Sequence, residues 1–287
     1  MITIQHLHFN YNSSSSEVFH DFSLNIADGK IVGLLGRNGT GKSTLLYLLT
    51  GLLRSTQGAI LVDDFDPQDR QPEMLQNIML VPEEIDLPAV KFKEFIKVNR
   101  VFYPNFSDEV LHQVLNDFQL PADIHLGALS MGQKKKVFMA FALATNTKYL
   151  LMDEPTNGLD IPSKVQFRRT IAAQMNENRT ILMSTHQVHD VEQLIDHVVM
   201  IDGQSLMLDT SMSQLSQKVR FEQRPYGTPI DDALYAEPSL TGTAVIVPAQ
   251  GKEETPISLE LLFNALVQNP ALRHHLEDTE ANNTGFH

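Results

Sequence analysis

Residues 36–43 read GRNGTGKS and fit the pattern G-x-x-x-x-G-K-[ST]. A short apolar run, residues 31–35, precedes this loop, and a helix-forming stretch, residues 44–49, follows it. Glycine lets the backbone curl so that consecutive N–H groups point at a phosphate chain, and the next helix presents its positive end to the same phosphates. In such a loop, Lys42 brings a cation to the β- and γ-phosphates, and the Ser43 hydroxyl is a ligand for Mg²⁺. Strand, glycine loop and helix together predict an α/β nucleotide-binding fold.

A second short apolar strand ends in two acids. Residues 150–154 read LLMDE, and ligands of α/β sheets bind beyond the carboxyl ends of the strands. Asp153 is therefore a candidate ligand for Mg²⁺, and Glu154 is a candidate for orienting or deprotonating the water that attacks the γ-phosphate. An acidic pair after a strand is by itself more often part of a solvated loop, so this prediction depends on the phosphate loop that precedes it in the chain.

The pentapeptide LSMGQ occupies residues 129–133, directly before a lysine-rich and apolar helical stretch, residues 134–144. Ser130 suits the N-cap of that helix and would leave the first N–H groups available to an anion. Alone, this pentapeptide indicates no more than the start of a helix. Its place shortly before the strand that ends in Asp153 and Glu154 gives it more weight.

These motifs together resemble those of the ATP-binding subunits of ABC transporters. The resemblance covers residues 1–215 and includes a D-loop-like segment, residues 157–160, and a switch segment, residues 184–186, in the family's order. It implies a P-loop NTPase (ABC ATPase) core with an antiparallel β subdomain and an α-helical subdomain at about 88–140. Residues 216–287 lie outside the motifs and are expected to form a small C-terminal domain.

The resemblance also assigns roles to residues. Catalysis falls to Glu154, Lys42 and His186, which contacts the γ-phosphate and senses its loss. Tyr11 matches the aromatic that stacks on adenine, although an ordinary strand tyrosine is an equal alternative. A metal site at His189, beside the switch, is a poorer interpretation because the hydrolytic cation already has ligands. The expected ATP-binding residues are Tyr11, Gly36, Asn38, Gly39, Thr40, Gly41, Lys42, Ser43, Thr44, Ser130, Gly132 and Gln133. The expected metal ligands are Ser43, Glu83 and Asp153.

At two positions the sequence departs from the family pattern. Glu83 stands where the family usually has glutamine; it can still bind Mg²⁺ but adds negative charge near the phosphates. Met131 stands where glycine is common in the signature, which leaves Ser130 and Gly132 usable. We interpret both departures as variation and not as loss of activity.

Partners and cofactors follow from the same resemblance. Two copies are expected to form a head-to-tail homodimer, with each ATP held by the P-loop of one copy and the signature of the other, and with Asp160 across the seam. ATP and Mg²⁺ are the implied cofactors. Binding closes the dimer and hydrolysis reopens it, which drives a separate integral membrane permease that rests on the helical insertion near residues 83–105. The implied direction of transport is export.

Composition limits the other possibilities. The 287 residues carry a formal net charge of −13, which argues against broad nucleic-acid binding, so no nucleic-acid partner is expected. There are no cysteines, which excludes disulfides, thiol catalysis and Cys-ligated zinc. The longest apolar run, residues 137–144, is too short to cross a bilayer, and the first residues lack the pattern of a signal peptide. We expect a cytoplasmic protein, peripheral at the inner face of the cell membrane through the permease.

Two further functions are alternatives. A soluble ABC-type ATPase acting in translation or DNA maintenance usually carries two cassettes or long coiled coils, and this chain has one cassette and no sustained heptad pattern. A non-catalytic, non-transport regulator is disfavoured because Lys42, Asp153, Glu154 and His186 are intact.

The C-terminal region carries no recognisable motif. We expect a linker at residues 224–227, a strand at residues 244–247 and an amphipathic helix from Ser258 to Val267, with Ser258 as its cap. A small regulatory or dimer-supporting domain and a structural cover for the sheet edge are equally good interpretations.

Overall fold

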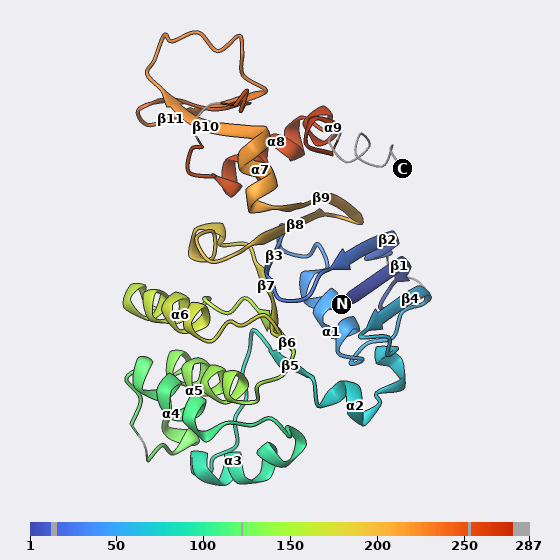
Figure 1. Cartoon of the computed structure of the whole chain (residues 1–287), viewed down its shortest axis with the longest axis vertical. Coiled ribbons are helices and arrows are strands. Elements are labelled where there is room, and N and C mark those ends of the chain that lie inside the picture. Colours follow the sequence, from blue (N-terminus) through green and yellow to red (C-terminus); the bar gives the residue numbers. More distant parts are fainter. Residues whose placement is uncertain (13–15, 122, 252–253, 278–287) are drawn as a thin grey trace.

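The computed structural model describes residues 1–12, 16–121, 123–251 and 254–277. A six-stranded sheet runs through its middle in the order β5-β6-β7-β3-β8-β9 (Figure 1). Five of these strands are parallel, and β9 pairs antiparallel with β8 at one edge. The strands are β3 (Ile31–Leu35), β5 (Ile78–Val81), β6 (Tyr149–Asp153), β7 (Thr180–Thr185), β8 (His197–Asp202) and β9 (Ser205–Ser211).

Both faces of this sheet are buried. On β6, Tyr149 and Leu151 belong to one hydrophobic core, and Leu150 and Met152 belong to the other. Because successive side chains point to opposite faces, a strand that is covered on both sides is apolar throughout. The strands predicted at residues 31–35, 149–152, 180–184 and 198–201 are confirmed.

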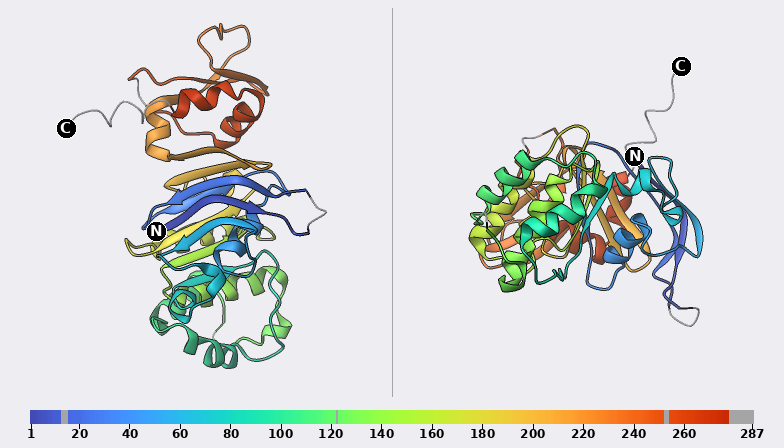
Figure 2. Two further views of the ribbon diagram at one scale, coloured as in Figure 1. Left: turned by 90° about the vertical axis from the view of Figure 1, so that its right-hand side faces the viewer. Right: turned by 90° about the horizontal axis from the view of Figure 1, so that it is seen from below.

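One face of the central sheet is covered by helix α1 and by a second, antiparallel sheet of order β2-β1-β4 (Figure 2). Buried leucines of α1, Leu45 and Leu46 among them, lie in the core shared by the two sheets. This arrangement fixes α1, and with it the loop that leads into it. The elements are β1 (Ile2–Phe9), β2 (Phe19–Ile26), β4 (Gln57–Val62), α1 (Lys42–Leu49) and the short α2 (Pro72–Leu75).

Helices cover the opposite face, and three of them form the expected helical insertion at the lower end of the molecule in Figure 1. The predicted stripes around Phe92 and Val114 lie on helices, and Ser107 caps the second of these as expected, accepting a hydrogen bond from the Val110 N–H. The helices are α3 (Phe92–Asn99), α4 (Asp108–Asp117), α5 (Met131–Ala144) and α6 (Ile161–Ala173).

Beyond β9 the chain forms a further unit with a three-stranded antiparallel sheet of order β10-β12-β11 (Figure 1). Helix α7 crosses the expected boundary at residue 215, and Phe221 and Leu262 belong to the same core as the central sheet. A division into two domains with separate roles stays a prediction, and residues 278–287 lie outside the described ranges. The elements are α7 (Met212–Lys218), β10 (Val219–Arg224), β11 (Tyr235–Ser239), β12 (Gly242–Pro248), α8 (Leu259–Gln268) and α9 (Ala271–Glu277).

The predicted linker at residues 224–227 is wrong. Arg224 is the last residue of β10 and pairs with Thr243 of β12, so the Pro-Tyr-Gly that follows is a loop inside the small sheet. The guanidinium of Arg224 binds the carboxylates of Glu222 at 2.9 Å and Asp232 at 2.6 Å. The pair with Asp232 holds the loop against the strand. The predicted strand at 244–247 and the helix capped by Ser258 are confirmed.

Among the described residues, no helix combines the length and the apolar character that crossing a membrane requires.

Candidate functional site

The glycine loop, residues 36–41, connects the carboxyl end of β3 to the start of α1. Gly41 has φ +96°, and a Cβ there would lie 2.7 Å from the Val18 Cγ1 atom. A Cβ at Gly36 would lie 2.6 Å from the Ile201 carbonyl oxygen. Both positions therefore require glycine, one for its backbone conformation as well as for space. The loop is held closely between the antiparallel sheet and β8.

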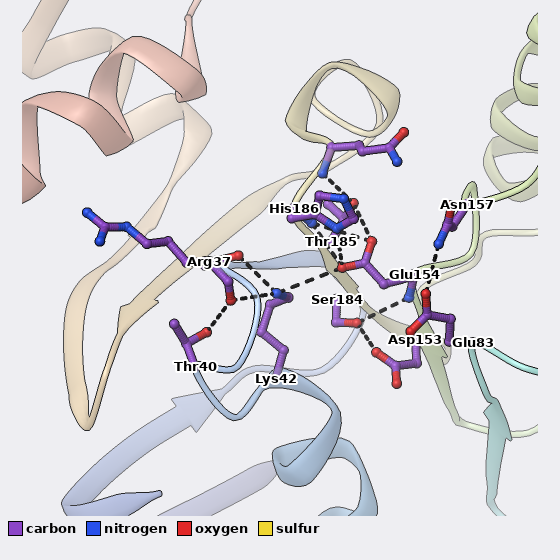
Figure 3. Close-up of polar contacts among 12 residues, drawn as sticks. Arg37, Thr40, Lys42, Glu83, Asp153, Glu154, Asn157, Ser184, Thr185 and His186 are labelled. Carbon is purple, nitrogen blue, oxygen red and sulfur yellow. Dashed lines mark hydrogen bonds and ion pairs between the residues drawn. The ribbon is translucent and has the colours of Figure 1, made fainter.

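Lys42 is the first residue of α1 and is only 6% exposed. Its ammonium donates hydrogen bonds to the carbonyl oxygens of Gly36 at 2.9 Å and Arg37 at 3.1 Å, and it lies 3.8 Å from Glu154 Oε1. Burial lowers the pKa of Lys42, while the negative charges of Glu154 and Asp153 offset part of that effect. A buried cation thus sits inside the loop, beside the acids that end β6 (Figure 3).

The two acids are almost fully buried, Asp153 at 1% exposure and Glu154 at 5%. The Ser184 hydroxyl donates a hydrogen bond to Asp153, and the Glu154 N–H donates to the Ser184 carbonyl oxygen at 3.1 Å. Glu154 has φ +44°, a left-handed conformation that a non-glycine residue rarely adopts and that costs about 1–3 kcal/mol. Such strained residues are concentrated at functional sites.

Neighbouring groups hold the Glu154 carboxylate in one orientation. It accepts hydrogen bonds from the Thr185 hydroxyl at 3.1 Å and from the His186 backbone N–H at 3.1 Å. The imidazole of His186 also contacts it, with Nδ1 2.8 Å from Oε1 (Figure 3). Because β6 and β7 are parallel neighbours, their carboxyl ends bring these groups to one edge of the sheet.

Tyr11 is exposed and lies at the start of α1, where its hydroxyl is 2.8 Å from the Thr44 hydroxyl. Phe9 contacts the Tyr11 ring in an edge-on arrangement. Ser43 is half-buried in the first turn of α1, and the Thr40 hydroxyl donates to the Arg37 carbonyl oxygen at 2.9 Å. The expected adenine and phosphate residues are therefore close in the fold. Their individual roles stay predictions; Asn38 and Gly39 are exposed in the same loop.

Glu83 is exposed just beyond β5 and is joined to the segment that follows Glu154. Its Oε1 atom accepts a hydrogen bond from Asn157 Nδ2 at 2.8 Å. Asp160, further along this segment, caps α6 by accepting from the Ser163 N–H at 2.9 Å. The position that departs from the family pattern thus contacts the D-loop-like segment.

The signature lies apart from this group. Ser130 caps α5, as expected, and forms a reciprocal capping box with Gln133. Ser130 and Gln133 are exposed, and Met131 is 75% exposed. Within the described ranges, no hydrogen bond joins Ser130, Gly132 or Gln133 to the glycine loop. The structure brings the loop, the acids and His186 together but leaves the signature outside.

Lys135 has a clear structural role, but it is not among the site residues predicted from the sequence. Its side chain is 4% exposed, and its ammonium donates to the carbonyl oxygens of Glu154 and Asn157, both at 2.9 Å. Burial lowers the pKa of Lys135. The available signal was helical phase, because Lys135 stands one turn before the buried Met139 of the same helix.

A cavity of ≈ 660 Å³ opens beside the loop, lined by Gly36, Asn38 and His186 on one side and by Phe263 and Asn264 of α8 on another. The C-terminal unit is therefore part of the wall of the cavity that also borders His186, a predicted catalytic residue. A contact of 2.8 Å between His189 Nε2 and Glu260 Oε2 links α8 to the segment after the switch.

Comparisons with known proteins agree on the family. The family model described as "ABC transporter" matches residues 19–157. The ABC transporter ATP-binding protein YtrB of Bacillus subtilis is 27% identical over 272 residues, which cover 87% of this chain and 93% of YtrB. The SkfA peptide export ATP-binding protein SkfE of the same organism is 32% identical over 207 residues, covering 70% of this chain and 86% of SkfE.

A solved structure described as the ATP-binding subunit of an ABC transporter has the same fold, with a TM-score of 0.67 and 22% identity over 75% of this chain and 91% of that one. The buried loop lysine and the strand-end acids are those of a P-loop nucleotide hydrolase. The chain belongs to the ATP-binding proteins of ABC transporters, and it is an ATPase.

Proposed function

We propose that this chain is the ATP-hydrolysing subunit of an exporter, in which two copies enclose ATP between the P-loop of one and the signature of the other. One observation carries the proposal. The loop, the acids and His186 lie together, whereas the exposed Ser130 end of α5 has no hydrogen bond to them in the described part of the chain. A two-fold, head-to-tail arrangement would bring the exposed helix start of one copy to the loop of the other.

A magnesium ion fits the oxygen donors that flank the loop. The Ser43 hydroxyl is half-buried on α1, and the Asp153 carboxylate is buried at the end of the adjacent β6. Magnesium prefers oxygen ligands and retains several waters. Glu83 is the third proposed ligand. When bound, the ion supplies positive charge that stabilises the phosphates during hydrolysis.

Within each site we assign the chemistry to groups whose positions are already fixed. Glu154 is oriented by Thr185 and His186, so its carboxylate can accept the proton of the attacking water. Lys42 supplies a buried cation for the β- and γ-phosphates. His186 touches Glu154 and borders the cavity, so it can report whether the γ-phosphate is present. Loss of the contact between His186 and the γ-phosphate after hydrolysis would reopen the dimer.

We place the permease on a separate apolar groove, of ≈ 920 Å³, between the helical insertion and the central sheet. Its walls include Tyr47 and Leu80 from the sheet side. From the insertion side come Val101 and Phe102, which are 71% and 62% exposed. An apolar groove of this kind suits the apolar face of a short helix from a partner protein. The groove overlaps the expected contact region at residues 83–105.

We propose export as the direction of transport, and one relative supports it. SkfE, by its name, serves peptide export, and it shares 32% identity with this chain. We extend that direction to this chain and place the protein at the inner face of the cell membrane, bound through its permease.

A mixing experiment tests the shared site. Lys42→Ala should abolish nucleotide binding by the P-loop half of each site. Ser130→Arg should block the signature half. Each variant alone should therefore lack ATPase activity. In an equal mixture, half of the dimers pair one copy of each, and every such dimer keeps one intact site. The mixture should therefore recover about one quarter of the wild-type rate. The measurement is phosphate release at saturating ATP.

The control mixes Lys42→Ala with Glu154→Gln. These residues lie 3.8 Å apart in the same chain, so no pairing of the two variants restores an intact site, and the mixture should remain inactive. Failure of the Lys42→Ala and Ser130→Arg mixture to regain activity, with both proteins folded, would refute the shared site.

A further inference from the structure

Three potential metal ligands meet in the antiparallel sheet, at the end of β1 and the start of β2. His8 belongs to β1, Glu17 precedes β2, and His20 belongs to β2. His8 Nδ1 lies 2.9 Å from Glu17 Oε1, and His20 Nδ1 lies 2.7 Å from Glu17 Oε2. One potential ligand atom from each of the three residues can be chosen so that all lie within 4.8 Å of one another. The centroids of the two imidazole rings are 4.9 Å apart.

The residue types favour one class of cation. Two imidazole nitrogens with one carboxylate suit zinc and similar transition metals, whereas Mg²⁺ and Ca²⁺ prefer all-oxygen sites. In tetrahedral zinc sites the metal–ligand distances are about 2.0–2.2 Å, so neighbouring ligand atoms are about 3.3 Å apart. The two nitrogen–oxygen distances, each to a different oxygen of Glu17, lie within about half an ångström of that spacing, and the three ligand atoms lie within 4.8 Å of one another, so an ion would also require them to adjust. Side chains at these strand ends can make that adjustment by small rotations.

We propose that His8, Glu17 and His20 form a binding site for a zinc-like divalent transition-metal ion, with water completing its coordination. Within the described ranges this is the only group of three such residues whose ligand atoms converge in this way. Solvent reaches it, because the side chains are 21%, 32% and 62% exposed in the same order. An open coordination position is therefore available to water.

The ion would join the end of β1 to the start of β2. Between these strand ends lies Tyr11, whose hydroxyl contacts Thr44 of α1. Val18 directly follows Glu17. Its Cγ1 atom lies so close to Gly41 that a Cβ at position 41 would clash with it. The side chain of Gln204, from the β8–β9 turn, donates a hydrogen bond to the Glu17 carbonyl oxygen at 2.7 Å. This hydrogen bond also holds the backbone at Glu17 in place. Metal binding would therefore stiffen the segment next to the glycine loop.

Titration of the full-length protein with ZnCl₂ after chelator treatment, without nucleotide, tests the site by calorimetry. Wild type should bind one zinc ion, and His20→Asn, His8→Asn and Glu17→Gln should each weaken that binding at least about tenfold. His6→Asn is the matched control, because His6 Nδ1 lies 2.6 Å from Asp21 Oδ1 on the same sheet, but among the described residues His6 and Asp21 belong to no group of three converging ligands. It should leave the affinity unchanged.

Circular dichroism and thermal unfolding check that each variant is folded. His20→Asn, whose side chain is the most exposed of the three, carries the test if the others fail to fold. Zinc that binds the folded His20→Asn protein as tightly as wild type, or a wild-type protein that binds no zinc, would overturn the proposal. Weakening by His6→Asn equal to that by His20→Asn would also overturn it, because binding would then be a general property of surface histidines.

Discussion

The cradle, which consists of Lys42, Asp153, Glu154 and His186, differs sharply from the signature at the start of α5. In the cradle, Lys42, Asp153 and Glu154 are at most 6% exposed, and Glu154 receives several hydrogen bonds. At the signature, Ser130 is exposed and Met131 is 75% exposed. Contacts within the chain organise the cradle, whereas the signature lies exposed at the surface.

The contrast separates residues that contacts within the chain already fix from residues that the proposed dimer would have to bring to the site. Burial and the neighbouring parallel strands fix the acids without help from a partner. The exposed start of α5 is held by its capping box, in which the Ser130 hydroxyl accepts from the Gln133 N–H and the Gln133 side chain accepts from the Ser130 N–H. Lys135 connects the two regions, because it lies one turn into α5 and binds the backbone of Glu154.

Glu154→Gln should show the largest effect, because it changes the chemistry of the cradle while keeping its shape. The amide oxygen can still accept from Thr185 or His186, but the side chain no longer takes a proton. We expect the ATPase rate to fall by about 10²–10⁴-fold, with ATP binding retained. The trapped dimer should appear by size-exclusion chromatography with ATP.

Glu84→Gln is the control for that substitution, since Glu84 is an exposed neighbour of the proposed metal ligand Glu83 and should leave the rate near wild type. An unaltered ATPase rate in the Glu154→Gln protein would remove Glu154 from the role of base.

Lys135→Met should show an intermediate effect, because it breaks the connection between the two regions. Two carbonyl oxygens lose their ammonium donor, which should lower the free energy of unfolding by about 1–3 kcal/mol. Since Glu154 then loses an anchor for its left-handed backbone, kcat should fall about tenfold while KM for ATP changes little. Steady-state kinetics and denaturant unfolding measure the two effects separately.

Lys136→Met is the matched control. Lys136 is half-buried and donates to Gln166 of α6 at 3.0 Å, so it holds the same helix by a contact that does not touch Glu154. It should affect stability more than kcat. An equal fall of kcat in both variants would mean that Lys135 acts only through general stability.

Local sequence predicts the cradle better than it predicts the connections around it. The glycine loop and the strand-end acids follow from short-range patterns, and the central strands are apolar because both faces are buried. Residues 134–136 are three consecutive lysines, and only the helical phase within the folded core selects the middle one for burial. Glu154 has a left-handed backbone that is held by hydrogen bonds to Ser184 and Lys135, and its own residue type does not predict this conformation.

The C-terminal unit includes a segment whose structure the local sequence predicts wrongly. Composition predicts a linker around Pro225, but Arg224 is held in a strand by Glu222 and by Asp232, eight residues further along the chain. Pairing with β12 completes that strand. Such contacts depend on chain segments that meet only after folding, so turn-forming residues outweighed the strand signal in the sequence.

Glu83→Gln should show the smallest effect and sharpens the comparison at the boundary of the cradle. The amide oxygen of glutamine can accept the hydrogen bond that Asn157 now donates at 2.8 Å, so only the charge is lost. Exposed charges contribute little, and we expect kcat to stay within about threefold of wild type. Glu83→Ala, which removes the acceptor as well, should reduce kcat further. If Glu83→Gln instead lowers kcat more than tenfold and raises the Mg²⁺ concentration needed for half-maximal rate, the carboxylate itself is required as a metal ligand.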